Sequence, residues 1–180
     1  ALFARACLEA TKSYQRQAVV YWIPALKIIQ ARFEPKLADL YWLISGNSLI
    51  PPGHEGQFRD AIQFGLCDSW ILPVYTLSAQ LEATVRRALK SAGEATRQLS
   101  KGREDELLIH DLLRKPALCG ILGKDLVFHL RCVLTEKAGL NLRNDAAHGL
   151  LDDAQVNQYG VIIWALALKM LCSRVEETEL

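Results

Sequence analysis

The stretch ILPVYTLSAQLEATVRRALKSA, residues 71–92, does most to decide the fold. Its apolar side chains recur every three or four residues, at positions 71, 74, 77, 81, 85, 88 and 89. This spacing places them on one face of an α-helix. The pattern reaches back to Phe58 and predicts either one long helix over residues 58–92 or two helices with a break near Pro73, ended in both cases by Gly93.

The same spacing continues along almost the whole chain, and sustained period-two alternation is nearly absent. The sequence therefore predicts an all-α, single-domain helical bundle of about six to eight helices. The other predicted helices cover residues 2–17, 19–31, 35–44, 104–113, 118–135, 140–148 and 153–175. Pro24 either kinks or starts its helix. The stretch 45–56, dense in Gly, Pro, Ser and Asn, is the one strong loop.

The charge balance excludes a protein that coats nucleic acid through its overall charge. Of the 180 residues, 51% are apolar and 23% are charged, and the net charge is +1. Nucleic-acid binding would therefore require a local patch. Residues 86–103 form one, with six basic residues against Glu94 alone. We expect Arg86, Arg87 and Lys90 to bind RNA there, although such a run also fits an ordinary solvated surface.

The cysteines and the apolar runs indicate the cellular setting. The five cysteines are odd in number and form no Cys-x-x-Cys pair, which predicts a reducing compartment, the cytoplasm. Residues 18–29 and 160–172 each contain a lysine and fall short of the ~20 residues of a membrane span. Residues 160–172 predict a central buried element or an oligomer contact. Because the chain opens without Met in a helical pattern, we expect a domain of a longer protein, whose remainder is one partner.

The densest polar cluster of the C-terminal half is GLNLRNDAAHGL, residues 139–150. If residues 140–148 form a short helix capped by Gly149, Asn144 and His148 share a face. Arg143 then lies ~140° around the helix from His148. The two side chains meet only if the arginine curls back or a second subunit supplies the partner, which favours a homodimer.

An imidazole beside a guanidinium suits phosphodiester cleavage. Histidine moves a proton near neutral pH, while arginine keeps its charge and binds phosphate through two hydrogen bonds. In RNA the neighbouring 2′-hydroxyl can serve as the nucleophile, so the chemistry needs no metal or other cofactor.

The block NLRNDAAHG, residues 141–149, resembles the HEPN superfamily, in which an arginine is followed four to six residues later by a histidine. More specifically, it resembles an uncharacterised HEPN-like family with the signature Arg-Asn-x-x-x-His-Gly. The likeness extends to the loop of residues 50–55 and to the Gln-x-Glu-x-x-x-Arg helix within residues 77–86, and covers about residues 48–175.

This resemblance implies an all-α bundle that dimerises with its two motifs facing each other. Active members are metal-independent endoribonucleases that leave a 2′,3′-cyclic phosphate and a 5′-hydroxyl. The resemblance further implies that His148 is the general base or acid, that Arg143 clamps phosphate, that Asn144 orients the histidine or the phosphate, and that Glu82 approaches the site. The superfamily also includes toxin-like proteins and non-catalytic members, so the alternative is an RNA-binding or protein-interaction module.

Each candidate residue also has a structural interpretation. His148 would cap a helix end, where a positive charge is favoured. Asn144 would be a buried amide that ties the short helix to its loop. Glu82 and Arg86, four residues apart, would form an intrahelical ion pair. Arg143 would pair with a nearby carboxylate, among Asp145, Asp152 and Asp153.

The remaining polar and aromatic residues favour structural roles. The spacing of Asp125, His129, His110 and Asp111 does not match that of a known metal site. The aromatic residues of the apolar segments predict core packing or a dimer interface rather than base stacking. They are Tyr21, Trp22, Tyr41, Trp42, Trp70 and Trp164.

Overall fold

The computed structural model describes residues 1–100 and 102–173 and confirms a mostly helical bundle around one hydrophobic core. Within these ranges the chain forms nine α-helices, a π-helical segment η1, a 3-10 helix η2 and one two-stranded hairpin. In chain order the elements are α1 (Leu2–Gln17), η1 (Ala18–Trp22), α2 (Ile23–Phe33), η2 (Leu37–Leu43), α3 (Glu55–Leu66), α4 (Ile71–Ser91), β1 (Arg97–Ser100), β2 (Arg103–Glu106), α5 (Ile109–Leu112), α6 (Pro116–Leu122), α7 (Lys124–Leu134), α8 (Leu142–Ala147) and α9 (Asp153–Cys172).

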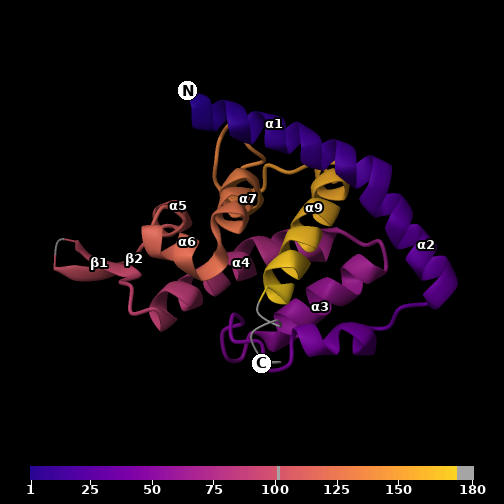
Figure 1. Cartoon of the computed structure of the whole chain (residues 1–180), viewed down its shortest axis with the longest axis horizontal. Coiled ribbons are helices and arrows are strands. Elements are labelled where there is room, and N and C mark those ends of the chain that lie inside the picture. Colours follow the sequence, from indigo (N-terminus) through magenta and orange to yellow (C-terminus); the bar gives the residue numbers. More distant parts are fainter. Residues whose placement is uncertain (101, 174–180) are drawn as a thin grey trace.

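The N-terminal helices form one long, bent rod along the edge of the bundle (Figure 1). Pro24 has no backbone N–H and its ring crowds the preceding turn, so a regular α-helix cannot continue through it undisturbed. The chain widens into η1 just before this proline, and the N–H of Ile23 donates to the carbonyl of Ala18, five residues back. The predicted helix 2–17 is confirmed, and the helix predicted over residues 35–44 is the 3-10 helix η2.

The stretch 58–92 contains two helices, as one of the two interpretations predicted. The break covers residues 67–70, where Asp68 adopts a left-handed conformation with φ of 56°. Pro73 lies in the first turn of α4, where backbone N–H groups have no partner within the helix, so its missing donor costs little.

Helix α9 runs through the centre of the bundle (Figure 1) and is buried along most of residues 160–171, which confirms the predicted central element. Two glycines allow its close approach to α3 and to the start of α4. A Cβ on Gly160 would lie 2.4 Å from the Cβ of Trp70, and one on Gly65 would lie 2.2 Å from Nε1 of Trp164. The two indoles pack edge to face with their centroids 6.2 Å apart. Trp70 and Trp164 are therefore core residues, as predicted.

Two predictions of secondary structure were wrong. The helix predicted over residues 104–113 is helical only at residues 109–112, because residues 103–106 pair antiparallel with β1 in a hairpin that projects from the bundle (Figure 1). The helix predicted over residues 118–135 is divided into α6 and α7 by Gly123, whose φ of 80° is left-handed. Lys101 of the basic stretch and residues 174–175 of the last predicted helix lie outside the described residues.

The aromatic residues of the N-terminal third do not all reach the core. Tyr21, Tyr41 and Trp42 are each more than half exposed, and only their position in apolar segments suggested burial. In the described ranges, no helix has both the length and the continuous hydropathy that crossing a lipid bilayer requires.

Candidate functional site

The polar motif of residues 143–148 lies on α8 and in the turn that follows it. Asn141, just before α8, has φ of 50°, and Gly149, just after it, has φ of 65°. The N–H of Leu150 donates to the carbonyl of Asp145, a bond that closes the C-terminal end of the helix. The short helix and its Gly149 cap, both predicted from the sequence, are thus present.

Arg143 reaches from α8 to α4 and forms an ion pair there. Its Nε donates to Oε2 of Glu82 at 2.9 Å, and the two side chains are 34% and 17% exposed. The alternatives that paired Arg143 with a nearby aspartate of its own segment are therefore wrong. Glu82 precedes Arg143 by 61 residues, so only packing of α8 against α4 brings them together.

Arg86 occupies the other oxygen of Glu82 and is bound on several sides. The expected intrahelical pair is present at 3.0 Å. Nη1 also donates to Glu106 at 2.6 Å, and the two Nη atoms bind the carbonyls of Thr96 and Leu107. Arg86 therefore ties the hairpin to α4, and RNA binding by its Nη atoms would require one of these contacts to break.

The hairpin adds a second arginine to this network. Arg97 of β1 donates through Nε to Glu106 of β2 at 2.6 Å. This hydrogen bond, together with the charges of Arg86 and Arg97, lowers the pKa of Glu106 below its ordinary value. Glu106 therefore remains an anion between the two guanidiniums at neutral pH.

A groove along α4 carries Arg87 and Lys90, the other two residues predicted to bind RNA, together with Arg86. This basic groove has a volume of about 430 Å³. Its lining residues are Pro51, His54, Ala79, Glu82, Ala83, Arg86, Arg87, Lys90 and Ser91. Arg87 donates through Nε to the carbonyl of Ser48 at 2.7 Å, and Lys90 is exposed.

A smaller pocket beside Arg143 adjoins the basic groove. This Arg143 pocket has a volume of about 230 Å³ and is lined by Tyr75, Ser78, Ala79, Glu82, Arg143, Ala146 and Ala147. Ala79 and Glu82 belong to both linings. The polar surface therefore continues along α4 from the motif to the basic groove.

Asn144 and His148 form no side-chain hydrogen bond with each other in the described part of the chain. Asn144 donates through Nδ2 to Oδ1 of Asn141 at 2.7 Å, which ties α8 to the residue before it. This contact agrees with the structural interpretation of Asn144. His148 is exposed, and its ring has no hydrogen-bond partner among residues 1–100 and 102–173. The described part of a single chain thus leaves the His148 ring without a hydrogen-bond partner beside the turn.

His54 is a further histidine of the site that the sequence analysis did not propose. It lies in the basic groove, and its Nδ1 hydrogen-bonds Oε1 of Gln80 at 2.7 Å. An amide oxygen only accepts, so Nδ1 of His54 is the donor in this hydrogen bond, and Nε2 is the other polar atom of the ring. The available signal was its place in the Pro-Gly loop just before a helix.

The arrangement offers anion-binding and proton-transfer groups. Guanidinium and ammonium groups line the basic groove. The imidazole of His54 also lies in this groove, and the imidazole of His148 belongs to the motif. Over the described ranges, no three His, Cys, Asp or Glu side chains lie close enough together to hold a metal ion. His129, one of the residues considered for a metal, hydrogen-bonds Tyr14 instead.

Comparisons with models of known protein families, with curated proteins and with solved structures find no match to this chain. Any functional conclusion therefore depends on the residues themselves.

Proposed function

We propose that the protein is a metal-independent endoribonuclease that cleaves RNA through its 2′-hydroxyl, leaves 2′,3′-cyclic phosphate ends and completes its active site across a homodimer. The observation that carries the proposal is the continuous polar surface along α4, which joins Arg143 of the motif to Arg87 and Lys90 of the basic groove through the shared wall at Glu82.

The ion pair with Glu82 leaves Arg143 able to bind phosphate. Of the donors of Arg143, only Nε is bound by Glu82, and within the described residues both Nη groups remain available for a bidentate contact with a phosphate. The carboxylate fixes the direction of the side chain and limits the entropy lost on binding. Arg143 is the proposed clamp for the charge that develops on phosphorus, and Glu82 is a positioning residue.

RNA approaching this clamp would follow the basic groove. Lys90 is exposed, and Arg87 uses its Nε for the backbone of residue 48, which leaves its Nη groups without a hydrogen-bond partner among the residues that the structure describes. These two residues are the proposed backbone contacts, whereas Arg86 serves mainly to fix the hairpin. Such contacts neutralise phosphates without reading bases, so the groove predicts little sequence preference.

The proposed proton-transfer residue is His148, which a second copy of the chain would bring to the clamp. An exposed imidazole at the end of α8 has no partner to hold it in the described part of one chain. Exposed apolar side chains lie close to the motif in sequence or at its pocket: Leu150 follows His148, and Tyr75 lines the Arg143 pocket. These residues support self-association around the motif.

One observation favours a second function, a non-catalytic RNA-binding or protein-interaction module. Glu82 lies between two guanidiniums and compensates part of their charge. A network that only fastens α8 and the hairpin to α4 would have the same contacts. In that case the motif stabilises the fold and the basic groove alone contacts the partner.

The test is incubation of the purified protein with labelled single-stranded RNA in EDTA, which removes divalent metals. We expect cleavage with cyclic-phosphate ends, and its loss in His148→Ala and in Arg143→Ala. The matched control is His110→Ala, because His110 lies on α5 outside the groove and the Arg143 pocket. Sedimentation of the same samples measures whether active protein is dimeric.

The outcomes separate the two functions. RNA binding without cleavage, unchanged in His148→Ala and weakened in Lys90→Gln, would favour the binding module. Cleavage that His54→Ala abolishes and His148→Ala leaves intact would move the proton-transfer role into the groove. Cleavage by a monomer would exclude the composite site.

A further inference from the structure

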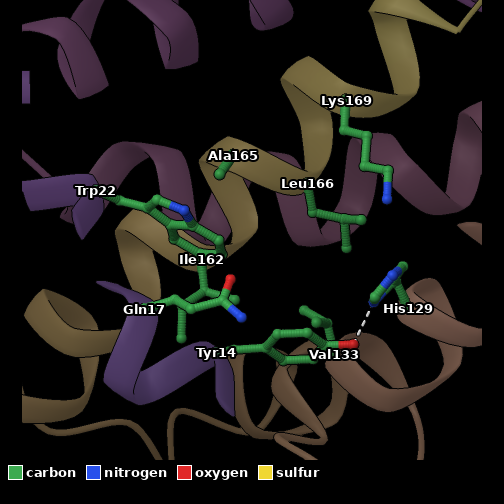
Figure 2. A pocket seen from close by; sticks show the side chains of 9 residues that line it. All are labelled: Tyr14, Gln17, Trp22, His129, Val133, Ile162, Ala165, Leu166 and Lys169. Atoms are coloured by element: carbon green, nitrogen blue, oxygen red, sulfur yellow. Dashed lines mark hydrogen bonds between the residues drawn. The ribbon is translucent and has the colours of Figure 1, made fainter. Parts of the chain in front are cut away.

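A further concave site lies where α1, η1, α7 and α9 meet (Figure 2). This Tyr14 cleft has a volume of about 260 Å³. Its lining residues are Tyr14, Gln17, Trp22, His129, Val133, Ile162, Ala165, Leu166 and Lys169. It shares no lining residue with the basic groove or the Arg143 pocket.

At one end of the cleft, Tyr14 and His129 form a neutral hydrogen-bonded pair (Figure 2). Burial raises the pKa of the Tyr14 phenol. Burial, followed by the charge of Lys169, lowers the pKa of His129 below its ordinary value. At neutral pH the phenol therefore donates to Nδ1 of an uncharged imidazole. The proton of that ring is then on Nε2, which becomes a donor.

Lys169 adds a positive charge to the same end. Figure 2 shows its ammonium group extending toward His129. No carboxylate among the described residues lies within ion-pairing distance of Lys169, and no acidic side chain lines the cleft. Asp125, one turn before His129, raises the pKa of this histidine, but by less than Lys169 lowers it. This end of the cleft is therefore rich in donors and net positive.

The other end and the floor of the cleft are mostly apolar, with the amide of Gln17 beside Trp22 as the polar group there. Trp22, at the end of η1, forms a wall, and Ile162, Leu166 and Val133 form the floor (Figure 2). Helical segments widened in this way are frequent at functional sites, and here Pro24 explains why the widening occurs just before it. An aromatic wall facing a positive end matches a ligand with a flat apolar body and an anionic head.

We propose that the Tyr14 cleft binds a small aromatic carboxylate, with its carboxylate at Lys169 and Nε2 of His129 and its ring between Trp22 and the apolar floor. The volume lies just below the range of about 300–1,000 Å³ typical of ligand pockets, which limits the ligand to a small one. This inference does not depend on the proposed ribonuclease activity, because the two sites use different residues.

The test compares two probes that differ in charge and little in shape, indole-3-acetate and the neutral indole-3-acetamide. Isothermal titration of the purified protein should show that the acetate binds at least about tenfold more tightly than the amide, because a charged hydrogen bond is stronger than a neutral one. The imidazole ¹⁵N signals of His129 should shift with the acetate.

Three variants locate the binding. Lys169→Gln should lower the affinity for indole-3-acetate to that for indole-3-acetamide. Ala165→Leu should weaken both probes, because its larger side chain fills the cleft that Ala165 lines. Lys27→Gln is the matched control and should bind as the original protein does, because Lys27 is an exposed lysine outside the cleft. Circular dichroism shows that each variant is folded.

Several results would overturn the proposal. If millimolar indole-3-acetate produces neither heat nor a shift of the His129 ¹⁵N signals, the cleft is not a carboxylate site. Equal affinity for the two probes would show that the ligand's carboxylate does not contribute to binding. An affinity for indole-3-acetate that is unchanged in Lys169→Gln would show that Lys169 does not bind the carboxylate. Binding that persists in Ala165→Leu places the probe elsewhere on the molecule. None of these results bears on RNA cleavage.

Discussion

The two faces of α4 differ in chemistry and in exposure to solvent. One face carries Leu77, Leu81, Val85 and Leu89, all fully buried in the core that α4 shares with α3 and α9. The other carries Glu82 and Arg86, and Arg143 reaches this face from α8; the three side chains remain partly open to solvent. Leu81 and Glu82 are neighbours in the chain, so one peptide unit separates the apolar core from the candidate functional site.

The comparison shows which interactions stabilise the fold and which position the site. The apolar face removes whole side chains from water and contributes through area and close packing. On the polar face, opposite charges compensate each other at a partial desolvation cost, so their net contribution to stability is modest. Changes on the first face should therefore cost more stability, and changes on the second should affect function more.

The largest effect is expected for Leu81→Ala. Truncation of a fully buried leucine loses transfer free energy and leaves a cavity, so the free energy of unfolding should fall by about 2–5 kcal/mol. Urea denaturation measures this loss, provided that the slope of the free energy of unfolding against urea concentration is unchanged. A loss below about 1 kcal/mol would show that this face of α4 is not tightly packed.

A somewhat smaller loss is expected for Gly160→Ala. The added Cβ would lie 2.4 Å from the Cβ of Trp70, so α9 or the start of α4 must shift, at a cost of about 1–3 kcal/mol. Gly120→Ala on α6 is the matched control. It meets nothing within 4 Å and should gain about 0.5–1 kcal/mol from helix propensity. If both variants behave alike in thermal denaturation, the close approach of the helices is not limiting.

Glu82→Gln should cost about 1–2 kcal/mol, because two guanidiniums lose their anion while solvent still screens them in part. A double-mutant cycle with Arg143→Gln measures the pair directly and should give a coupling of at least about 0.5 kcal/mol. Under the proposed function, Glu82→Gln also lowers the rate of RNA cleavage by releasing Arg143. An unchanged rate would limit Glu82 to a structural role.

The smallest effect on stability is expected for His148→Ala. The ring is exposed and has no partner in the described ranges, so the free energy of unfolding should change by no more than about 0.5 kcal/mol. The same variant should abolish cleavage. A clear loss of stability would mean that His148 packs in solution against something beyond the described chain, and would weaken its assignment to proton transfer.

The helices were predictable where their signal is local. The bounds of α1 were predicted because apolar side chains three and four residues apart mark a helix face without reference to the rest of the chain. The hairpin was missed because residues 103–106 are all exposed and show no alternation. They form a strand through pairing with β1 and through the contact of Glu106 with Arg86, twenty residues away.

The candidate site was predictable only in part. The motif on α8 is contiguous, so Arg143 and His148 were selected from the sequence, whereas Glu82 was linked to them only by the resemblance. His54 and the Tyr14 cleft were missed as sites. Tyr14 and His129 are 115 residues apart, and neither belongs to a pattern that indicates contact with the other.

The sequence by itself determined an all-α chain, a buried last helix and a short helix carrying Arg143 and His148, because these properties depend on side-chain spacing over a few residues. The tertiary structure decided that Arg143 meets Glu82, that Glu82 is shared with Arg86, and that a cleft with a positive end forms beside η1. Ion pairs and cavities between distant segments depend on how helices pack, and helix packing is set by the sum of contacts across the core.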